Sequence, residues 1–327
     1  MIVISEADAR ALVTMSDAID AMASAFRSVH AGRALSFPLV RERIEEKRAV
    51  FGVKSGADVP DDILGLKAGG YWSGNADRGL TNHQSSTVLF DPDTGQPDAF
   101  VSGNFLTALR TAAVAGLATR HLARPDAAVM GIIGTGGQAI FQIEAVCSVR
   151  PIERLLVAAR TREAAVRLGE AVQARQLPPV EIVSTREAAE RADVLTSVTT
   201  ARSPLVSADW ISPGTHINAM GADTTGKQEL DPELLRTGRV FVDDWTQAAA
   251  VGECQHAVAA WNMRDTDTAG TLGALVAGAV PGREDDRQVT VFDSTGMAIQ
   301  DLAIARMVVE RARRQGRGID VPLAEAD

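Results

Sequence analysis

One lysine stands in an apolar, glycine-rich stretch of the chain. Residues 61–75 read DDILGLKAGGYWSGN, and Lys67 lies between Leu66 and Ala68. A lysine on a short apolar strand is commonly an edge residue, or one whose stem lies on apolar surface while its ammonium reaches water. The other interpretation is a cation held in a pocket, where it would meet a carboxylate or a carbonyl of a ligand.

A second group of residues has the spacing of a dinucleotide site. In MGIIGTGGQA, Gly134, Gly136 and Gly137 follow an apolar run and precede a helical one that begins near Gln138 and Ala139. Ala139 stands at the third glycine position of the fingerprint, where alanine can replace glycine. Gly134 would allow the tight turn, and Gly136 would let the backbone approach a pyrophosphate at the helix N-terminus. The strand–turn–helix context predicts dinucleotide binding.

The next apolar strand ends in LLVAARTR. An NAD site usually carries Asp or Glu there to bind the ribose 2′-hydroxyl, whereas this chain has Arg160, Thr161 and Arg162. Two guanidiniums and a hydroxyl suit a 2′-phosphate, so NADPH is slightly favoured over NADH. The alternative is a solvated basic loop.

Composition excludes several classes of function. The chain has 327 residues, which is enough for two domains, and its net charge of −9 gives no basic surface for nucleic acid. No apolar run approaches the roughly 20 residues that cross a bilayer, and the N-terminus lacks the basic region of a signal peptide. Cys147 and Cys254 are too few for a disulfide framework and favour a reducing cytoplasm. The five histidines show no metal spacing, even around Cys254 and His256, so no metal is expected.

The elements that position these residues fall into two zones. Residues 1–35 read as one helix that Ser5 caps and Gly32 ends; residues 36–103 read as strands, the last two forming a hairpin, and residues 104–123 as a helix capped by Asn104. From residue 126 to 292, apolar strands alternate with helices, which predicts a Rossmann-type, doubly wound parallel α/β sheet. The helix at 297–316 is expected to pack back onto the first zone.

Three separated stretches resemble one known family. Residues 103–139, 217–231 (INAMGADTTGKQELD) and 289–303 (VTVFDSTGMAIQDLA) are similar to the ornithine cyclodeaminase/mu-crystallin family. The resemblance implies a Rossmann domain at 126–292 and a discontinuous α+β domain, 1–125 with 293–327, that binds substrate and forms a homodimer through its sheets. Members include ornithine cyclodeaminase, ketimine, pyrroline-carboxylate and iminosuccinate reductases, and alanine dehydrogenase. Their shared chemistry is hydride transfer at a carbon that bears an amine or imine beside a carboxylate.

The resemblance assigns roles to residues of the first domain and to one aspartate. Lys67 matches a lysine that contacts the carboxylate and imine region, and Arg110 matches an arginine shared between cofactor and carboxylate. Arg41 is the best match for a second carboxylate arginine. Asp223 matches the catalytic aspartate. Independently of the family, Asp223 follows the apolar strand INAMG, where parallel sheets bind ligands and a carboxylate can relay a proton.

The remaining matches concern the cofactor and the substrate pocket. Thr295 is expected to contact substrate. The expected cofactor contacts lie in loops after apolar strands or near the fingerprint: Asn82, Arg110, Gly134, Gly136, Gly137, Gln138, Arg160, Thr161, Thr199, Met220, Gly221, Lys227 and Ser294. Asn82 stands where the cyclodeaminase has threonine.

One segment departs from the family pattern. Residues 51–58 read FGVKSGAD, with Lys54 and Ser55 where many relatives have Met-Pro, and with Gly52 where ornithine cyclodeaminase has a glutamate suited to a distal ammonium. A distal ammonium beside an uncompensated lysine would be costly to desolvate, so a substrate with a second carboxylate fits better. The alternative is that Lys54 points to solvent.

These observations predict an NAD(P)H-dependent reductase that converts a small α-imino acid to the L-amino acid, with iminosuccinate, reduced to aspartate, as the simplest candidate. Three alternatives stay open. They are an ornithine cyclodeaminase-type lyase with recycled NAD, a ketimine or pyrroline-carboxylate reductase, and a non-catalytic, crystallin-like NADPH-binding protein.

Overall fold

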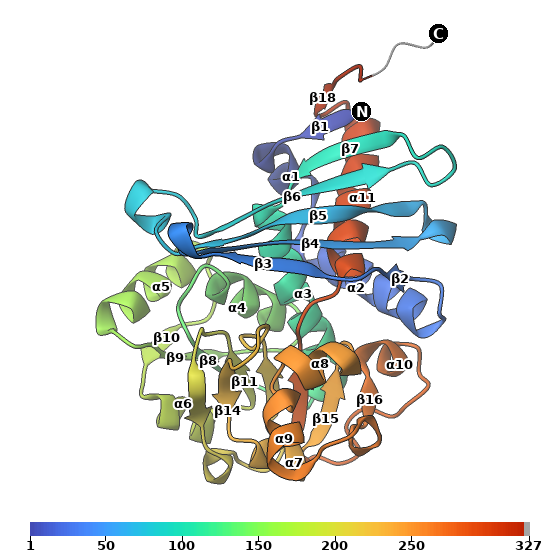
Figure 1. Cartoon of the computed structure of the whole chain (residues 1–327). Coiled ribbons are helices and arrows are strands. Elements are labelled where there is room, and N and C mark those ends of the chain that lie inside the picture. The colour runs from blue at the N-terminus through green and yellow to red at the C-terminus, as the bar shows by residue number, and fades with distance from the viewer. Residues whose placement is uncertain (324–327) are drawn as a thin grey trace. The chain divides into compact units, whose positions relative to one another are not determined.

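A computed structural model describes residues 1–323 (Figure 1). The chain divides into two compact units: unit 1 comprises Met1–Arg110 and the segment from Met297 onward, and unit 2 comprises Thr111–Gly296. The first division between the units falls inside helix α3 (Asn104–Leu122), whose later part bonds to the sheet of unit 2, where Asn218 Nδ2 donates to Thr119 Oγ1 at 2.9 Å. The domain bounds 1–125 with 293–327 and 126–292 stay a prediction. Residues 324–327, the end of the predicted first domain, lie outside the described residues.

Unit 1 is built on one mixed sheet. Its order is β18 (Ile319–Asp320), β1 (Ile2–Ile4), β7 (Pro97–Ser102), β6 (His83–Phe90), β5 (Ile63–Trp72), β4 (Ala49–Asp58) and β2 (Leu35–Ser36), and β3 (Val40–Ile44) also pairs with β4. All neighbouring pairs are antiparallel except β1 and β7. Short 3-10 turns connect the strands at η1 (Glu45–Lys47), η2 (Val59–Asp61) and η3 (Ala76–Arg78). The strands predicted for residues 36–103, including the final hairpin, are confirmed.

The prediction of one N-terminal helix is wrong. The segment forms β1 and two helices, α1 (Glu6–Leu12) and α2 (Met15–His30). Ser5 does cap α1, but Thr14 and Asp17 then form a capping box that begins α2. A capping box satisfies the free N–H groups of a helix start, so it favours a new helix over a continued one. Gly32 follows the end of α2 with φ +69°, as expected.

Asn104 does not cap α3 as predicted. Its side-chain oxygen accepts a hydrogen bond from Ser85 N at 2.8 Å, and its amide donates to Gln84 Oε1 at 3.0 Å. The residue therefore ties the start of α3 to strand β6.

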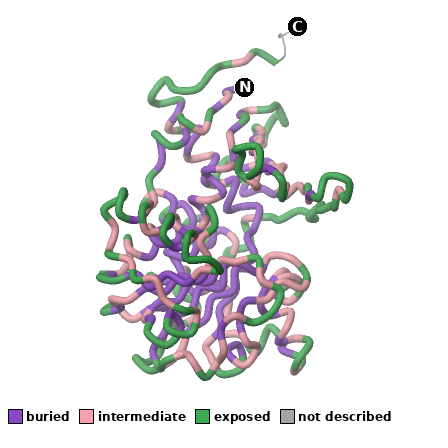
Figure 2. The backbone as a smooth tube through the Cα atoms, turned by 90° about the vertical axis from the view of Figure 1, so that its left-hand side faces the viewer, coloured by how far each residue is buried: buried purple, intermediate pink, exposed green. Residues whose placement is uncertain are grey.

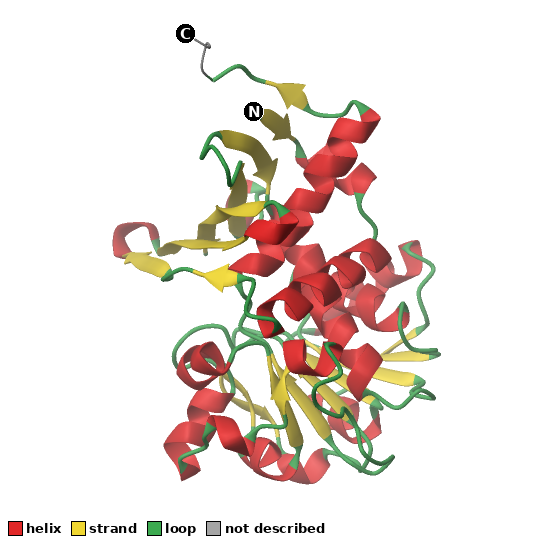
Figure 3. Cartoon of the chain, turned by 90° about the vertical axis from the view of Figure 1, so that its right-hand side faces the viewer, coloured by secondary structure: helices red, strands yellow, loops and turns green. Residues whose placement is uncertain are grey.

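Helix α11 (Ala298–Gln315) lies along one face of the unit 1 sheet, as Figures 1 and 3 show, which confirms that the last helix packs on the first zone. Glycines let it approach closely. A Cβ added to Gly56 would lie 3.6 Å from Ala298 Cβ, and one added to Gly65 would lie 3.2 Å from Leu302 Cδ2. Strands β4 and β5, which carry these glycines, therefore lie close to the first turn of α11, and so do the neighbouring side chains on the same face.

The other face of this sheet is apolar and open in the single chain. Val40, Phe51 and Phe100 are 53%, 40% and 39% exposed. Val40 of β3 pairs with Val53 of β4, and Val53 is two residues after Phe51 on that strand. Val40, Val53 and Phe51 therefore lie on the same face of the sheet.

Unit 2 is a doubly wound parallel sheet with a small two-stranded sheet beside it. The order is β10 (Val180–Ile182), β9 (Arg154–Ala158), β8 (Val129–Ile133), β11 (Val194–Ser197), β13 (His216–Ala219), β17 (Thr290–Asp293), β15 (Arg239–Val242) and β16 (Gly270–Thr271). The second sheet pairs β12 (Arg202–Val206) with β14 (Gln228–Leu230). The helical segments are α4 (Ala139–Cys147), α5 (Arg162–Ala174), α6 (Thr185–Arg191), η4 (Ala208–Trp210), α7 (Glu233–Thr237), α8 (Trp245–Val251), α9 (Cys254–Trp261), η5 (Asp265–Asp267) and α10 (Leu272–Val276).

Side chains of the unit 2 strands alternate between two hydrophobic clusters. Ile132 and Val157 belong to one cluster, and their neighbours Ile133 and Leu156 belong to the other. The strands are accordingly buried on both faces (Figure 2), which is typical of α/β sheets. The α/β Rossmann-type fold is confirmed. Strand β8 lies between β9 and β11, where the crossovers change direction, so the loop after β8 is at the position where such sheets bind ligands.

Among residues 1–323, no helix is long and apolar enough to cross a membrane, and no group of three or more His, Cys, Asp and Glu side chains is arranged to hold a metal ion.

Candidate active site

The glycine turn after β8 has the shape that a dinucleotide requires. Gly134 has φ +108°, and a Cβ there would lie 2.7 Å from Val198 O, so only glycine fits. A Cβ added to Gly136 or Gly137 would have no atom within 4 Å, which leaves open space before α4. Gln138 Oε1 is buried without a hydrogen-bond partner in the described chain. The open turn and the free N–H groups at the N-terminus of α4 together fit a pyrophosphate.

The end of β9 carries the residues that are predicted to bind the 2′ group of the cofactor ribose. Arg160, Thr161 and Arg162 are all exposed. Thr161 also begins α5, since its hydroxyl accepts a hydrogen bond from Ala164 N at 3.3 Å. Arg160 and Arg162 are thus accessible at the end of β9, and the preference for NADPH stays a prediction.

A buried glutamate orders the loops that follow β11 and β13. Glu229 accepts hydrogen bonds from Ser197 Oγ at 2.9 Å, Thr199 N at 2.5 Å and Gly221 N at 2.9 Å. A Cβ on Gly221 would lie 2.4 Å from the Glu229 carboxylate, so glycine is required there. Burial raises the pKa of Glu229. The predicted contacts Thr199 and Gly221, with buried Met220 before it, are thus placed by a residue that sequence reasoning missed.

Asp223 and Lys227 form an ion pair at the carboxyl edge of the sheet. Lys227 Nζ lies 2.6 Å from Asp223 Oδ1 and also donates to Gly221 O at 3.1 Å. Thr224 Oγ1 donates to the same Asp223 oxygen at 3.1 Å. The Asp223 side chain is 44% exposed, so its carboxylate is oriented but still accessible to a ligand.

Asp243 holds the loop that follows β17. It accepts hydrogen bonds from Ser294 Oγ at 3.2 Å, Thr295 N at 2.8 Å, Thr295 Oγ1 at 2.9 Å and Gly296 N at 2.6 Å. Ser294 and Thr295 are therefore fixed together, as expected of neighbouring contacts. Sequence reasoning missed Asp243, although a carboxylate directly after the apolar run VFV is a signal for it.

Two further buried carboxyls lie behind these loops. Glu253 accepts hydrogen bonds from Glu229 N at 2.7 Å and Leu230 N at 3.1 Å. Asp293 Oδ2 accepts one from Cys254 N at 3.0 Å. Burial, reinforced by the neighbouring carboxylates, raises the pKa of Glu253 to about 9 and that of Asp293 to about 7.

In unit 1, three buried charged side chains meet on the face that α11 covers. Lys67 Nζ lies 2.8 Å from Asp301 Oδ2, and Arg110 Nε donates to Asp301 Oδ1 at 2.8 Å. The three side chains are 10%, 8% and 2% exposed for Lys67, Arg110 and Asp301. Lys67 is thus a cation held in the interior, not an edge residue whose ammonium reaches water. Asp301 is a third residue that sequence reasoning missed.

Lys54 shares this face with Lys67. The two residues are direct cross-strand partners on β4 and β5, and cross-strand partners point to the same side of a sheet. Lys54 is partly buried. Burial first, then Arg110 and Lys54, lowers the pKa of Lys67 to about 8, and Asp301 opposes the shift.

Two other residues of unit 1 that are predicted to contact substrate or cofactor, Arg41 and Asn82, lie outside this buried cluster. Arg41 is exposed on β3, opposite Gly52 of β4. Gly52 is two residues before Lys54 on the same strand, so Arg41 lies on the same face of the sheet as Lys54 and its partner Lys67. Asn82 instead serves its own loop: its oxygen accepts from Ala76 N at 3.0 Å and its amide donates to Tyr71 OH at 3.0 Å. Its role as a cofactor contact stays a prediction.

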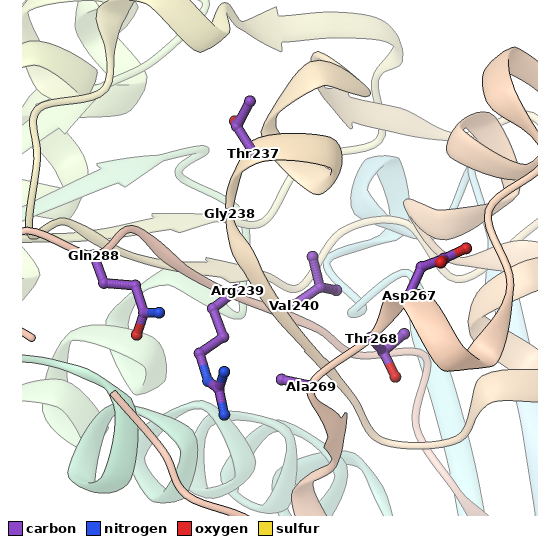
Figure 4. Close-up of a pocket in the computed structure, with 8 residues that line it drawn as sticks. All are labelled: Thr237, Gly238, Arg239, Val240, Asp267, Thr268, Ala269 and Gln288. Carbon is purple, nitrogen blue, oxygen red and sulfur yellow. The ribbon is translucent and has the colours of Figure 1, made fainter. Parts of the chain in front are cut away.

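A surface cavity of about 300 Å³ lies elsewhere on unit 2 (Figure 4). Thr237, Gly238 and Arg239 line it at the start of β15, with Gln288 ahead of β17. In a parallel sheet this is the amino edge, opposite the edge where the glycine turn lies. Because such sheets bind ligands at the carboxyl edge, this cavity is not part of the candidate site.

Comparison with known proteins agrees with this arrangement. A sequence profile of the ornithine cyclodeaminase/mu-crystallin family matches residues 1–316. The iminosuccinate reductase of Paracoccus denitrificans is 44% identical over 323 residues, 99% of this chain and 100% of the relative. Its crystal structure in complex with NAD⁺ covers 99% of both chains with a TM-score of 0.93.

Two other solved structures are similar over almost the whole chain. One is Thermococcus litoralis Δ¹-pyrroline-2-carboxylate reductase in complex with NADH and L-proline, which is 33% identical with a TM-score of 0.94 and covers 98% of this chain and 100% of its own. The other is an archaeal alanine dehydrogenase dimer with bound NAD, which is 35% identical with a TM-score of 0.93 and covers 99% of both chains. The glycine turn, the carboxyl-edge residues and these full-length similarities agree, and the chain belongs to the ornithine cyclodeaminase/mu-crystallin family.

Proposed function

We propose that the protein reduces a small α-imino acid that carries a second carboxylate, with iminosuccinate as substrate, L-aspartate as product and a nicotinamide dinucleotide as hydride donor. The observation that carries the proposal is the register that sets Lys54 directly opposite Lys67, on the face that also presents Arg110. The 44% identity to an iminosuccinate reductase supports the same substrate.

The charge of this group matches a dicarboxylate. Lys54, Lys67 and Arg110 are cations and Asp301 is an anion, so the four groups together carry two net positive charges. Burial opposes ionisation of Asp301, but Arg110 and Lys67 outweigh it and lower the pKa of Asp301 to about 2, so the anion persists at neutral pH. A substrate with two carboxylates would bring an anion to Lys54 as well as to Lys67 and Arg110, whereas a monocarboxylate would bring only one.

The overall reaction adds a hydride to the imine carbon and a proton to the imine nitrogen. A reduced nicotinamide dinucleotide, with its pyrophosphate held at the glycine turn, would supply the hydride. Arg110 and Lys67 would bind the α-carboxylate, and Lys54 the second one. Asp223 would hold and transfer the proton at its carboxylate oxygen, next to Lys227.

The cyclodeaminase alternative is disfavoured by position 52. Ornithine needs an anion for its distal ammonium, and a Cβ added to Gly52 would lie 2.6 Å from Val40 O. No side chain fits there without a backbone shift. The non-catalytic alternative is disfavoured because Lys67, Arg110 and Asp223 are all present. Reduction of a monocarboxylate or cyclic imine remains the competing activity.

Replacing Lys54 with methionine tests whether Lys54 binds a second carboxylate of the substrate. A charge-assisted hydrogen bond contributes about 1.5–3 kcal/mol, so kcat/KM for oxaloacetate plus ammonia should fall by about 10- to 100-fold. The value for pyruvate plus ammonia should be spared, because pyruvate has no second carboxylate. The measurement is the oxidation of NADH and NADPH with each ketoacid.

The matched control is Lys47→Met, the same substitution at an exposed position of η1. It should leave both activities unchanged. Equal losses on the two ketoacids for Lys54→Met, or no loss on either, would contradict the dicarboxylate assignment and leave a monocarboxylate or cyclic imine as substrate.

The cofactor preference is a separate proposal. With Arg160 and Arg162 exposed at the end of β9, we expect NADPH to be used better than NADH, and Arg160→Asp to shift the preference toward NADH because it replaces a phosphate-binding charge with one that repels phosphate. The measurement is kcat/KM with each nucleotide, and Arg175→Asp, in the C-cap of α5, is the control. An unchanged protein that already prefers NADH, as the NAD-bound relatives suggest, would contradict the charge argument.

The homodimer and the cytoplasmic location also stay proposals. The open apolar face around Phe51 and Phe100 would be covered by the same face of a second copy, and a similar structure is described as a dimer. A monomer at micromolar concentration in sedimentation velocity would contradict this. The described chain has two free cysteines, Cys147 and Cys254, which is compatible with a reducing compartment.

A further inference from the structure

One carboxylate serves both buried cations of unit 1. Asp301 Oδ2 contacts Lys67 Nζ at 2.8 Å, and Asp301 Oδ1 accepts from Arg110 Nε at 2.8 Å. Its neighbour Gln300 accepts from Arg110 Nη1 at 2.7 Å. Thr107, one turn before Arg110 on α3, lies with its hydroxyl 3.5 Å from Lys67 Nζ. Both cations are therefore held by Asp301, with Gln300 as a second partner of Arg110 and Thr107 as a second partner of Lys67.

The fold fixes the position of this carboxylate. Asp301 lies in the first turn of α11, where the helix dipole favours an anion. Ala298 and Leu302 flank it and pack over Gly56 and Gly65 of the sheet. The backbone of α11 is thus seated on β4 and β5, which places the Cα atom of Asp301 within reach of Lys67.

From this geometry we infer that Asp301 is a positioning residue of the reaction, which orients Lys67 and Arg110 as a pair toward the substrate carboxylate and offsets one of their two charges. This inference rests on the proposed function, in which those two cations bind substrate. Asp301 has both of its oxygens on the cations, so it acts through them.

The Asp301 carboxylate also affects the protonation of Lys67. The charged groups that act on its ammonium are Lys54 on β4, Arg110 on α3 and Asp301 on α11. Burial and the two cations favour the neutral amine, and only Asp301 among these three favours the ammonium. Removing the Asp301 charge should therefore lower the pKa of Lys67 from about 8 into the range where enzymes are assayed.

The lysine content of the chain allows a direct measurement. There are four lysines, Lys47, Lys54, Lys67 and Lys227. Labelling the lysine side chains with ¹³C gives four ε-carbon signals, which Lys→Arg variants assign, and a pH titration reads the Lys67 pKa without substrate. Asp301→Asn should lower that pKa by about 1–3 units, the usual effect of losing an opposite charge at this distance. Asp301→Glu retains the charge one methylene away and should shift it less.

The control is Asp98→Asn. Asp98 also contacts two cations of α11, Arg306 at 3.2 Å and Arg313, but lies away from Lys67 on β7. It should leave the Lys67 titration unchanged. A folded Asp301→Asn protein with an unshifted Lys67 titration would overturn the inference. If Asp301→Asn does not fold, Asp301→Glu decides it: a Lys67 pKa and a kcat/KM for oxaloacetate plus ammonia both equal to those of the unchanged protein would also overturn the inference.

The pH dependence of kcat/KM tests whether the Asp301 charge affects the reaction. The alkaline limb of kcat/KM for oxaloacetate plus ammonia should move to lower pH in Asp301→Asn by as much as the Lys67 pKa moves. A shifted pKa with an unmoved pH profile would overturn the positioning role. If the unchanged protein reduces none of the imino acids, the proposed function fails, and the titration still decides whether Asp301 controls Lys67.

Discussion

Replacing Asp223 with asparagine should lower kcat for imine reduction by about 10²- to 10⁴-fold, the range typical of a lost general acid–base group. Asparagine keeps the size of the side chain and its hydrogen bond from Thr224, but it cannot take up or release a proton. Because Asp223 is separate from the glycine turn after β8, the affinity for the nucleotide should stay nearly unchanged. Steady-state kinetics with saturating nucleotide, together with a fluorescence titration of NADH or NADPH, measure the two quantities.

Asp209→Asn is the control for this prediction. Asp209 is an exposed carboxylate of η4 in the same unit, so its loss should change neither quantity. An Asp223→Asn protein with an unchanged kcat would remove Asp223 from the mechanism. Loss of nucleotide binding with the catalytic step intact would instead mean that the pair with Lys227 is a structural element of the cofactor site.

Lys67→Met is expected to impair every substrate. If the ammonium binds the α-carboxylate that all imino acids share, kcat/KM should fall by at least about 10- to 100-fold for both oxaloacetate and pyruvate, since one charge-assisted hydrogen bond is lost. The loss should fall mainly on kcat if the ammonium also touches the reacting nitrogen. Measuring both ketoacids beside Lys54→Met separates the two lysines, because the second variant should affect only the diacid.

Stability must be separated from activity in this experiment. Lys67→Met leaves the buried Asp301 with one cation fewer, and breaking a buried pair typically costs about 3–5 kcal/mol. The double variant Lys67→Met with Asp301→Asn removes both charges, so its melting temperature should recover in part while its activity stays low. Lys47→Met controls for the substitution itself. A single variant that keeps full activity on either ketoacid would show that Lys67 does not bind the shared carboxylate.

The sequence predicts the parts of this protein that local patterns encode. Apolar strands alternating with helices after residue 126 predict the parallel sheet, and the spacing of Gly134, Gly136 and Gly137 predicts the turn that follows β8. The N-terminal error has a local cause as well. Thr14 and Asp17 have the spacing of a capping box, but the continuous apolar periodicity around them favoured one long helix over two.

Asp301 and Glu229 could not be predicted in this way. Asp301 binds Arg110 from 191 positions away in the chain, and no local pattern connects them. Glu229 likewise acquires its role from loops that the sheet order brings together, whereas Asp243 has a local signal in its position after the apolar run VFV. Lys54 is an intermediate case, since its face follows from the strand register once the pairing of β4 with β5 is known.

The discontinuity of unit 1 has a consequence for the order in which the protein forms. During synthesis the first 110 residues leave the ribosome early, but α11, which closes their sheet, follows only after the whole of unit 2. Domains generally fold as units as they emerge, so we expect the nucleotide-binding unit to be complete while Lys67 and Arg110 still lack Asp301. Lys67, Arg110 and Asp301, which we propose to act on the substrate carboxylate, are then expected to come together last, so that a nascent chain should bind nucleotide before it can reduce an imine.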